Sequence, residues 1–179
     1  MTHSFYETRM ELPGKINVLI VTLSDRAHRG EYSDLSGPRV KEILMRFFGE
    51  QDWQAEFNLT LLPDDSAMLE SILKSAGNIY QLIFTTGGTG IGPRDITVET
   101  VRPLLSKEIP GIMEFIRVKY GSEKPNALLS RGVAGILGDA LIYTLPGSVK
   151  AVEEYLGEIL RTLKHSFEMK SGTDKHPGH

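Results

Sequence analysis

The segment Ile16–Leu23 constrains the fold of this chain more than any other feature. It is nearly continuous in apolar and β-branched residues, a pattern typical of a strand buried on both faces of a parallel sheet. Two more strands are expected, within Ala55–Leu62 and over residues 80–85. Helical periodicity lies between the strands, over residues 39–48 and Ser66–Ala76. This alternation predicts a three-layer α/β/α domain with a mostly parallel sheet.

The second half of the chain adds one antiparallel strand to this prediction. Residues 133–137 and Ala140–Leu145 are apolar and flank Gly138-Asp139, a pair typical of a tight hairpin turn. Further helices are expected over residues 97–105, with Thr97 as the candidate cap, over residues 110–120 and 126–131, and from Ser148 onward. We expect three parts: an N-terminal extension over residues 1–14, one domain over 15–167, and a polar, mobile tail over 168–179.

Composition narrows the possible functions. The formal net charge of -3 argues against a non-specific nucleic-acid binder, which would usually be basic. The absence of cysteine excludes a disulfide scaffold, a zinc–thiolate site and a cysteine nucleophile. No apolar stretch approaches the roughly 20 residues that span a bilayer, and no signal peptide is visible. A cytoplasmic protein without a nucleic-acid or membrane partner is therefore expected.

The loop over residues 85–97 carries the richest chemistry. In doubly wound sheets ligands bind beyond the carboxyl ends of the strands, and this loop follows a predicted strand. Three glycines in four positions allow close approach of a ligand and present N–H groups to an anion. Arg94 adds a cation, and Asp95 adds a carboxylate for a metal or a polar group. The loop fits neither the dinucleotide fingerprint nor the P-loop pattern, and a glycine turn required by tight strand-to-helix geometry is the alternative.

Three other loops that follow predicted strands also carry polar residues. These residues are Asp25, Asp34 and Ser36 in the first loop, Asp64 and Asp65 in the second, and Pro146, Gly147 and Ser148 in the third. Taken alone, helix capping explains the first two loops better than a site does. For the third loop, a cap and an anion site are equally good explanations. Acidic residues beside a glycine loop suit a phosphorylated ligand with magnesium but do not identify the ligand.

Together, the loops resemble the molybdopterin-binding family of molybdenum cofactor biosynthesis over residues 15–167. The main motif is Thr-Thr-Gly-Gly-Thr-Gly over residues 85–90, followed by Asp95. Supporting motifs are Ser24-Asp25, Asp34 with Ser36-Gly37-Pro38, Leu62-Pro63-Asp64, Leu129-Ser130-Arg131 and Leu145-Pro146-Gly147. Residues 92–97 are most similar to the molybdopterin adenylyltransferase branch, which includes bacterial Mog-type enzymes and domains of a plant protein and of animal gephyrin.

The resemblance implies magnesium-dependent transfer of AMP from ATP to the terminal phosphate of molybdopterin, with release of pyrophosphate. It implies that Asp64 and Asp95 serve catalysis and magnesium binding. The residues that it implies for substrate binding are Asp25, Asp34, Thr86, Gly87, Gly88, Thr89, Gly90, Ser130, Arg131, Pro146, Gly147 and Ser148. A homotrimer and a downstream molybdenum insertase are implied as partners. Two alternatives stay open: a paralogue that binds molybdopterin without efficient adenylylation or serves tungsten, and a scaffold protein.

Overall fold

The computed structural model describes residues 14–172, so the predicted extension before Gly14 and the last seven residues of the predicted tail lie outside the described part. The helices are α1 (Asp25–His28), α2 (Ser36–Glu50), α3 (Ser66–Ala76), α4 (Thr97–Val101), α5 (Pro110–Gly121) and α6 (Val149–Ser171), with short 3₁₀ helices η1 (Arg102–Leu104) and η2 (Pro125–Leu129). The strands are β1 (Ile16–Leu23), β2 (Ala55–Leu62), β3 (Leu82–Thr86), β4 (Lys107–Glu108), β5 (Ala134–Leu137) and β6 (Ala140–Leu145).

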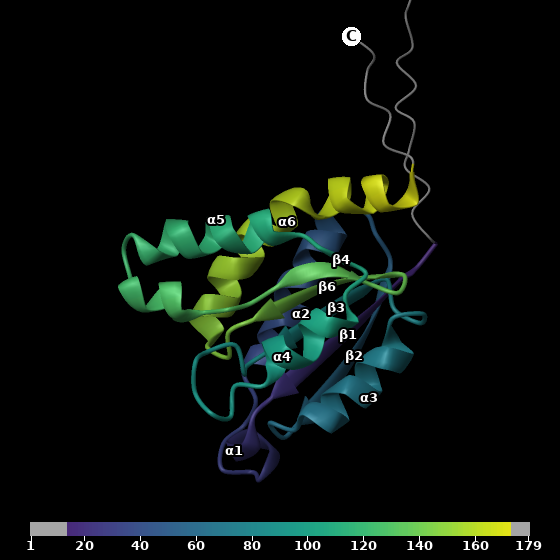
Figure 1. Cartoon of the computed structure of the whole chain (residues 1–179). Coiled ribbons are helices and arrows are strands. Elements are labelled where there is room, and N and C mark those ends of the chain that lie inside the picture. Colours follow the sequence, from purple (N-terminus) through teal and green to yellow (C-terminus); the bar gives the residue numbers. More distant parts are fainter. Residues whose placement is uncertain (1–13, 173–179) are drawn as a thin grey trace, which may run out of the picture.

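The strands form a single sheet in the order β2-β1-β3-β6-β5-β4 (Figure 1). Neighbours among β2, β1, β3 and β6 run parallel, whereas β5 runs antiparallel to both β6 and β4. The expected hairpin at residues 138–139 is therefore present. The prediction of a mostly parallel sheet with one antiparallel strand is confirmed.

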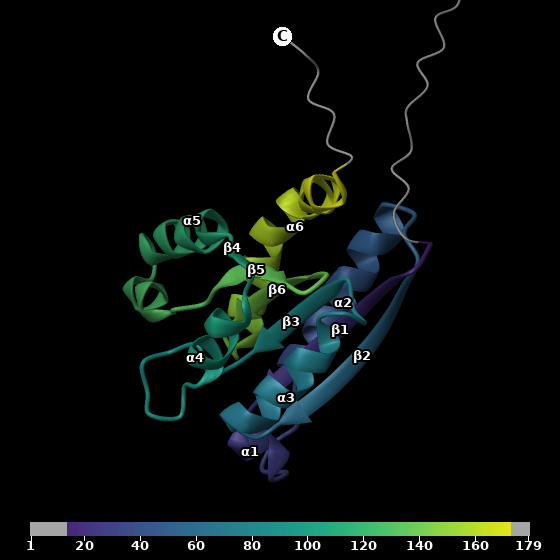
Figure 2. The ribbon, with the colours of Figure 1, turned by 45° about the vertical axis from the view of Figure 1, so that its right-hand side comes forward.

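Helices cover both faces of the sheet, and each face has its own apolar core (Figure 2). On one face, α2, α5 and α6 pack around alternate residues of β1, β3 and β6, among them Phe84 and Tyr143. On the other face, α3 and α4 pack on the intervening residues, such as Val21 and Ile83. Alternation of side chains along each strand produces the two cores, since successive residues point to opposite faces. The three predicted layers are present.

The register brings the four parallel strands to a common edge. Leu23 pairs with Leu62, and Thr86 pairs with both Thr22 and Leu145. The strands therefore end within a residue or two of one another. The loops after β1, β2, β3 and β6 emerge side by side at this carboxyl edge, as expected for parallel strands.

Several element boundaries differ from the predictions. The four-residue helix α1 lies in a segment expected to be a loop, and the two-residue strand β4 was not expected. The helix expected over residues 97–105 is shorter, because α4 gives way to η1 at Arg102. Helix α6 continues through Ser171, so the first residues assigned to the tail are helical.

Two predicted caps are also wrong. Ser36 is not the cap of α2: the helix begins at Ser36, after a Leu35 cap that makes no side-chain hydrogen bond. Thr97 is the first residue of α4, and its hydroxyl donates to the Gly87 carbonyl instead. Both hydroxyls lie in buried residues near the glycine loop, which gives them tertiary partners that outcompete local capping.

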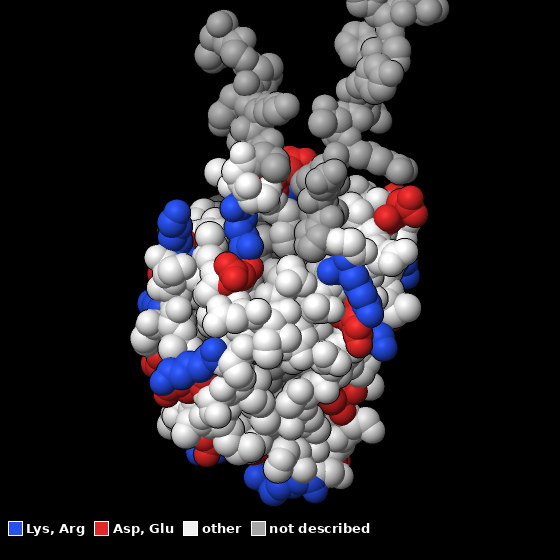
Figure 3. Space-filling model, turned by 90° about the vertical axis from the view of Figure 1, so that its right-hand side faces the viewer, with Lys and Arg blue, Asp and Glu red and all other residues white. Residues whose placement is uncertain are grey.

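Two features bear on possible partners: the apolarity of the helices and the distribution of charge on the surface. Within residues 14–172, no helix is long and apolar enough to cross a membrane. On the face in Figure 3, basic and acidic side chains lie scattered and often next to one another. Such interspersed charges agree with the small net charge of the chain.

Candidate functional site

Two predicted site residues, Asp25 and Asp64, are joined by a pair of reciprocal hydrogen bonds. The Asp25 backbone N–H donates to Asp64 Oδ2, and the Asp64 backbone N–H donates to Asp25 Oδ1, both at 3.0 Å. Arg94 completes the group, because its Nε and Nη2 donate to Asp25 Oδ2 at 3.0 and 2.8 Å. The loops after β1, β2 and β3 are thereby joined at one point of the carboxyl edge.

This arrangement favours the ionised form of Asp25. The pKa of its carboxyl is lowered chiefly by the Asp64 backbone N–H and further by the Arg94 guanidinium, against a smaller opposing effect of burial. A carboxylate that accepts an N–H and pairs with a guanidinium stays charged at neutral pH. Asp25 therefore contributes a fixed negative charge beside Arg94, the exposed cation of this group.

The glycine loop turns sharply as it leaves β3. Gly87 and Gly88 have φ angles of +91° and +67°, a region that favours glycine. A Cβ on Gly87 would lie 2.3 Å from the Leu23 carbonyl oxygen, and one on Gly88 would lie 2.4 Å from Thr97 Oγ1. The Gly87 N–H donates to the Leu145 carbonyl, and the Thr97 N–H donates to the Gly88 carbonyl. These positions therefore need glycine because other chain segments touch the loop.

The next part of the loop leaves backbone donors unused. Among residues 14–172, the N–H groups of Gly88, Thr89 and Gly90 donate to no protein acceptor. Successive free N–H groups beside positive φ angles are the elements of backbone turns that bind anions in proteins. Nearby, the Thr86 and Ser36 hydroxyls lie 2.6 Å apart in the buried interior. The predicted residues Thr86 to Gly90 thus form one turn, in which three N–H groups have no protein acceptor among residues 14–172.

Asp95 closes this turn from the other side. Its Oδ2 accepts the Gly92 N–H at 2.7 Å, and a Cβ on Gly90 or Gly92 would lie within 2.9 Å of that oxygen. Asp64 and Asp95 each have a second carboxylate oxygen that no N–H or O–H of residues 14–172 contacts. Within the same residues, no group of three or more acidic or histidine side chains is placed to hold a metal. A divalent ion would therefore need additional oxygens from a ligand.

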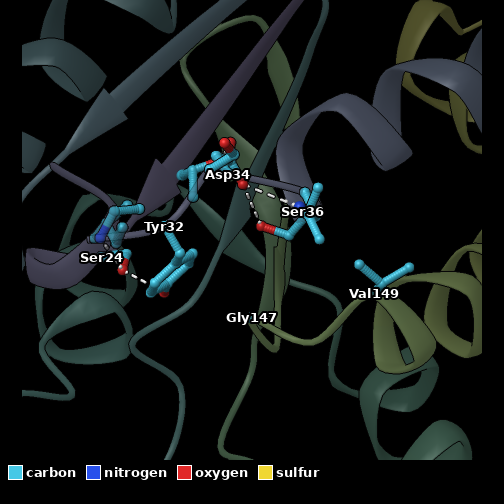
Figure 4. A pocket seen from close by; sticks show the side chains of 11 residues that line it. Ser24, Tyr32, Asp34, Ser36, Gly147 and Val149 are labelled. Carbon is cyan, nitrogen blue, oxygen red and sulfur yellow. Dashed lines mark hydrogen bonds between the residues drawn. The ribbon is translucent and has the colours of Figure 1, made fainter. Parts of the chain in front are cut away.

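A pocket of about 200 Å³ opens beside α2 and α6, and Asp34 forms part of its wall (Figure 4). Tyr32 and Val149 lie on opposite sides of it, with Asp34 and Ser36 between them. Asp34 Oδ1 accepts the Ser36 N–H and hydroxyl and the Gly37 N–H, and its Oδ2 accepts the Thr22 hydroxyl at 2.6 Å. Both oxygens of Asp34 are thus occupied by the protein, which makes this residue a structural part of the pocket.

The remaining predicted residues come from the segments before β5 and after β6. The Ser130 hydroxyl lies 3.5 Å from the Thr89 hydroxyl, and Arg131 donates to the glycine loop. Gly147 lies next to the loop, since its Cβ would be 3.3 Å from Gly87 Cα. Ser148 caps α6 by accepting the Ala151 N–H, and Pro146 is half-buried at the end of β6. All predicted site residues therefore lie along the carboxyl edge.

Sequence reasoning missed two residues at this edge. Tyr32 borders the pocket, its hydroxyl 2.7 Å from the Ser24 hydroxyl and its ring under the Arg26 guanidinium. Glu99 pairs with Arg131 beside the glycine loop. An aromatic residue in a polar loop was the signal for the first of these, whereas Glu99 resembles an ordinary surface residue of a helix.

Comparison with known sequences identifies relatives along nearly the whole domain. A family described as a probable molybdopterin binding domain matches residues 19–165. A molybdopterin adenylyltransferase of Helicobacter pylori is 34% identical over 159 residues, which cover 88% of this chain and 89% of that protein. Another from Pyrococcus furiosus is 35% identical over 176 residues, with 90% and 98% covered. Gephyrin of Dictyostelium discoideum is 37% identical over 166 residues, but the match covers 87% of this chain and only 23% of gephyrin.

Solved structures agree with this result. The molybdopterin biosynthesis enzyme MoaB of Thermus thermophilus superposes with a TM-score of 0.77 at 36% identity, covering 88% of this chain and 97% of that one. The MoaB of Pyrococcus furiosus, described as a tungsten cofactor synthesizing protein, superposes with a TM-score of 0.74 at 32% identity, covering 89% of this chain and 99% of that one. The fold of this chain is therefore shared with solved MoaB structures.

Proposed function

The chain belongs to the family described as a probable molybdopterin binding domain, and we propose that it is a molybdopterin adenylyltransferase of molybdenum cofactor biosynthesis. In this reaction an oxygen of the terminal phosphate of molybdopterin attacks the α-phosphorus of ATP. A new P–O bond forms, the bond to the β-phosphate oxygen breaks, and adenylyl-molybdopterin and pyrophosphate result. Relatives of that name, aligned along nearly their full length, support the proposal.

The observation that carries the proposal is the anion-binding turn beside the aspartates. Free N–H groups of Gly88, Thr89 and Gly90 offer donors to phosphate oxygens, and Arg94 offers a cation at the same edge. Both substrates are polyanions, so their approach depends on such fixed donors. Catalysis of nucleotidyl transfer then consists largely of aligning the attacking oxygen with the phosphorus.

We assign Asp64 and Asp95 to magnesium coordination and phosphate positioning, not to nucleophilic attack. Each keeps one carboxylate oxygen without a protein donor among residues 14–172, which suits a hard cation. Magnesium is commonly held by one or two carboxylates together with substrate phosphates, so the two aspartates are a sufficient protein contribution. When bound, the ion would neutralise charge on the phosphate oxygens.

The other residues receive supporting roles in the proposal. Thr86 to Gly90 hold a phosphate, and Asp25 keeps Arg94 at the nucleotide side. Asp34 shapes the pocket beside Tyr32 because both of its oxygens are already bound. Ser130, Arg131, Pro146, Gly147 and Ser148 border the pterin phosphate.

We also propose a homotrimer that passes its product to a separate molybdenum insertase. Support for self-association comes from exposed apolar side chains on α5 and η2, namely Phe115, Val118, Leu128 and Leu129. Sedimentation velocity checks this part directly. A monomer at micromolar concentration would contradict the proposed trimer but would leave the proposed reaction unaffected.

The decisive experiment mixes the purified protein with molybdopterin and Mg-ATP and follows pyrophosphate and the adenylylated product. We expect product that requires molybdopterin and that falls at least about a hundredfold in Asp95→Asn, because a phosphate-positioning carboxylate is lost. Asp64→Ala should mainly damage the magnesium-dependent step. Tight molybdopterin binding without product would instead identify a binding paralogue. Activity of Asp95→Asn near the wild-type rate would remove that residue from the proposed site.

A further inference from the structure

Arg131 makes three hydrogen-bond contacts with the glycine loop, two through its guanidinium and one through its backbone N–H. Its Nε donates to the Gly90 carbonyl at 2.7 Å, and its Nη2 approaches the Asp95 carbonyl at 3.4 Å. Its own backbone N–H donates to the Thr89 carbonyl at 2.9 Å. The guanidinium therefore spans the turn from Gly90 to Asp95, the segment whose ends are the anion-binding N–H groups and the predicted catalytic carboxylate.

Glu99 holds this guanidinium in place. Its Oε1 accepts from Arg131 Nη1 and its Oε2 from Nη2, so the two planar groups meet as a two-point pair. The pair lowers the pKa of Glu99 and raises that of Arg131, so both stay charged. Such fork-to-fork pairing fixes direction as well as distance.

The contacts leave Arg131 little capacity for a substrate. An arginine has five N–H donors, and Nε, Nη1 and Nη2 are all engaged with Gly90, Asp95 and Glu99. These contacts use four of the five donors, so a phosphate that paired with the guanidinium through two N–H groups would have to displace one of these partners. The geometry instead suits a group that orders the loop, whose own backbone then meets the ligand.

Asp95 depends on this order. Its carbonyl faces Arg131, while its carboxylate accepts the Gly92 N–H within the same turn. Rotation of the turn would move the carboxylate and the free N–H groups together. We infer that Glu99 is a positioning residue for the proposed adenylyl transfer, which acts through Arg131 to set the Gly90–Asp95 turn; this inference rests on the proposed function.

The test compares Glu99→Gln with Glu70→Gln. Both glutamates line a second pocket, between α3 and α4, but within residues 14–172 Glu70 forms an ion pair only with Lys74 of its own helix. Glu99→Gln should lower kcat about tenfold to a hundredfold, since a small displacement of reacting groups has effects of that size. The KM for ATP should change less than about threefold, because Arg94 and Asp25, which the proposal places at the nucleotide side, pair with each other and not with Glu99. Glu70→Gln should match the wild type in both constants.

Two further measurements separate positioning from folding. Thermal unfolding of Glu99→Gln should stay within a few degrees of the wild type, because the pair is partly exposed. Hydrogen exchange of the Gly92 and Asp95 amides, which donate within the turn, should nevertheless become faster. Arg131→Lys keeps the charge but loses the fork, and adding Glu99→Gln to it should cause no further loss of kcat.

Each outcome decides the inference. A kcat of Glu99→Gln equal to that of Glu70→Gln, with unchanged loop exchange, overturns it, as does additive loss in the double variant. If the wild-type protein forms no adenylyl-molybdopterin, the proposed function fails instead. Hydrogen exchange of the loop amides and the Kd for molybdopterin then test the positioning role. That role requires both quantities to change in Glu99→Gln and neither to change in Glu70→Gln.

Discussion

The glycine loop after β3 and the loop after β1 leave the same edge of the sheet but are held in different ways. Residues 86–97 are fixed mainly through their backbone: Leu145, Thr97 and Arg131 bond to peptide groups of the loop. Residues 24–35 have backbone hydrogen bonds within the loop but are fixed to the rest of the protein mainly through the side chains of Asp25 and Asp34. The first loop therefore tolerates no added Cβ at its turn, whereas the second depends on the identity of two carboxylates.

This difference predicts the largest effect for Gly87→Ala. The new Cβ would meet the Leu23 carbonyl at a φ of +91°, so strain and overlap add. We expect the free energy of unfolding to fall by about 3 kcal/mol or more. Urea denaturation of the variant and the wild type measures this difference in the free energy of unfolding.

Gly30→Ala is the matched control in the loop after β1. Gly30 has a φ of +77° but no atom within 4 Å of a new Cβ. Backbone strain alone should then lower stability by about 1 kcal/mol. Equal losses in the two variants would mean that contact with β1 contributes nothing to the glycine requirement.

A smaller effect is expected for Asp34→Ala. The change removes the acceptor for the Thr22 hydroxyl and for the Ser36 and Gly37 N–H groups, so stability should fall by about 2 kcal/mol. Asp34→Asn keeps the shape and one oxygen for the two N–H groups, and its amide can donate to Thr22, so it should lose less than about 1 kcal/mol. If the two variants unfold at the same urea concentration, hydrogen bonding by this side chain does not hold the loop.

The smallest effect concerns the contact between the two loops. Arg94→Ala removes one cause of the lowered pKa of Asp25, so that pKa should rise toward the ordinary 3.8 but stay below it, because the Asp64 N–H remains. A pKa lowered by folding adds stability above 3.8 that is lost as the pH falls through the folded value. Arg94→Ala should therefore lose part of this acid-dependent stability and change little at pH 7. NMR titration of the Asp25 carboxyl checks it; an unchanged pKa would show that the arginine does not interact with Asp25 in solution.

Most of the fold was predictable because the spacing of apolar residues along the sequence determines which segments become buried strands and helices. Ile16–Leu23 and Ala140–Leu145 are buried along nearly their whole length, and their bounds match the predictions within a residue. The missed element β4 has only two exposed charged residues, Lys107 and Glu108, which carry no strand pattern. Helix α1 is one turn in a polar loop, stabilised by the Ser24 cap and by contacts that the loop makes in space.

The candidate site was predictable to a lesser degree. Motif spacing placed Asp25, Asp64 and the glycine loop near one another, since each follows a parallel strand. It did not predict that the polar atoms of Arg131 and Asp34 are hydrogen-bonded to other protein groups, because a sequence gives the donors and acceptors but not their partners. Ser36 and Thr97 were predicted as helix caps for the same reason, and each finds a tertiary partner instead.

The mutual hydrogen bonds of Asp25 and Asp64 have an evolutionary consequence. Each aspartate supplies the acceptor for the other's backbone N–H, so replacing one leaves the other without its partner. Replacing this pair by a different pair of residues through single substitutions would pass through a variant in which one hydrogen bond is lost, so the steps would not be neutral. Positions 25 and 64 should therefore change together across the family or not at all, even though they lie 39 positions apart in the chain.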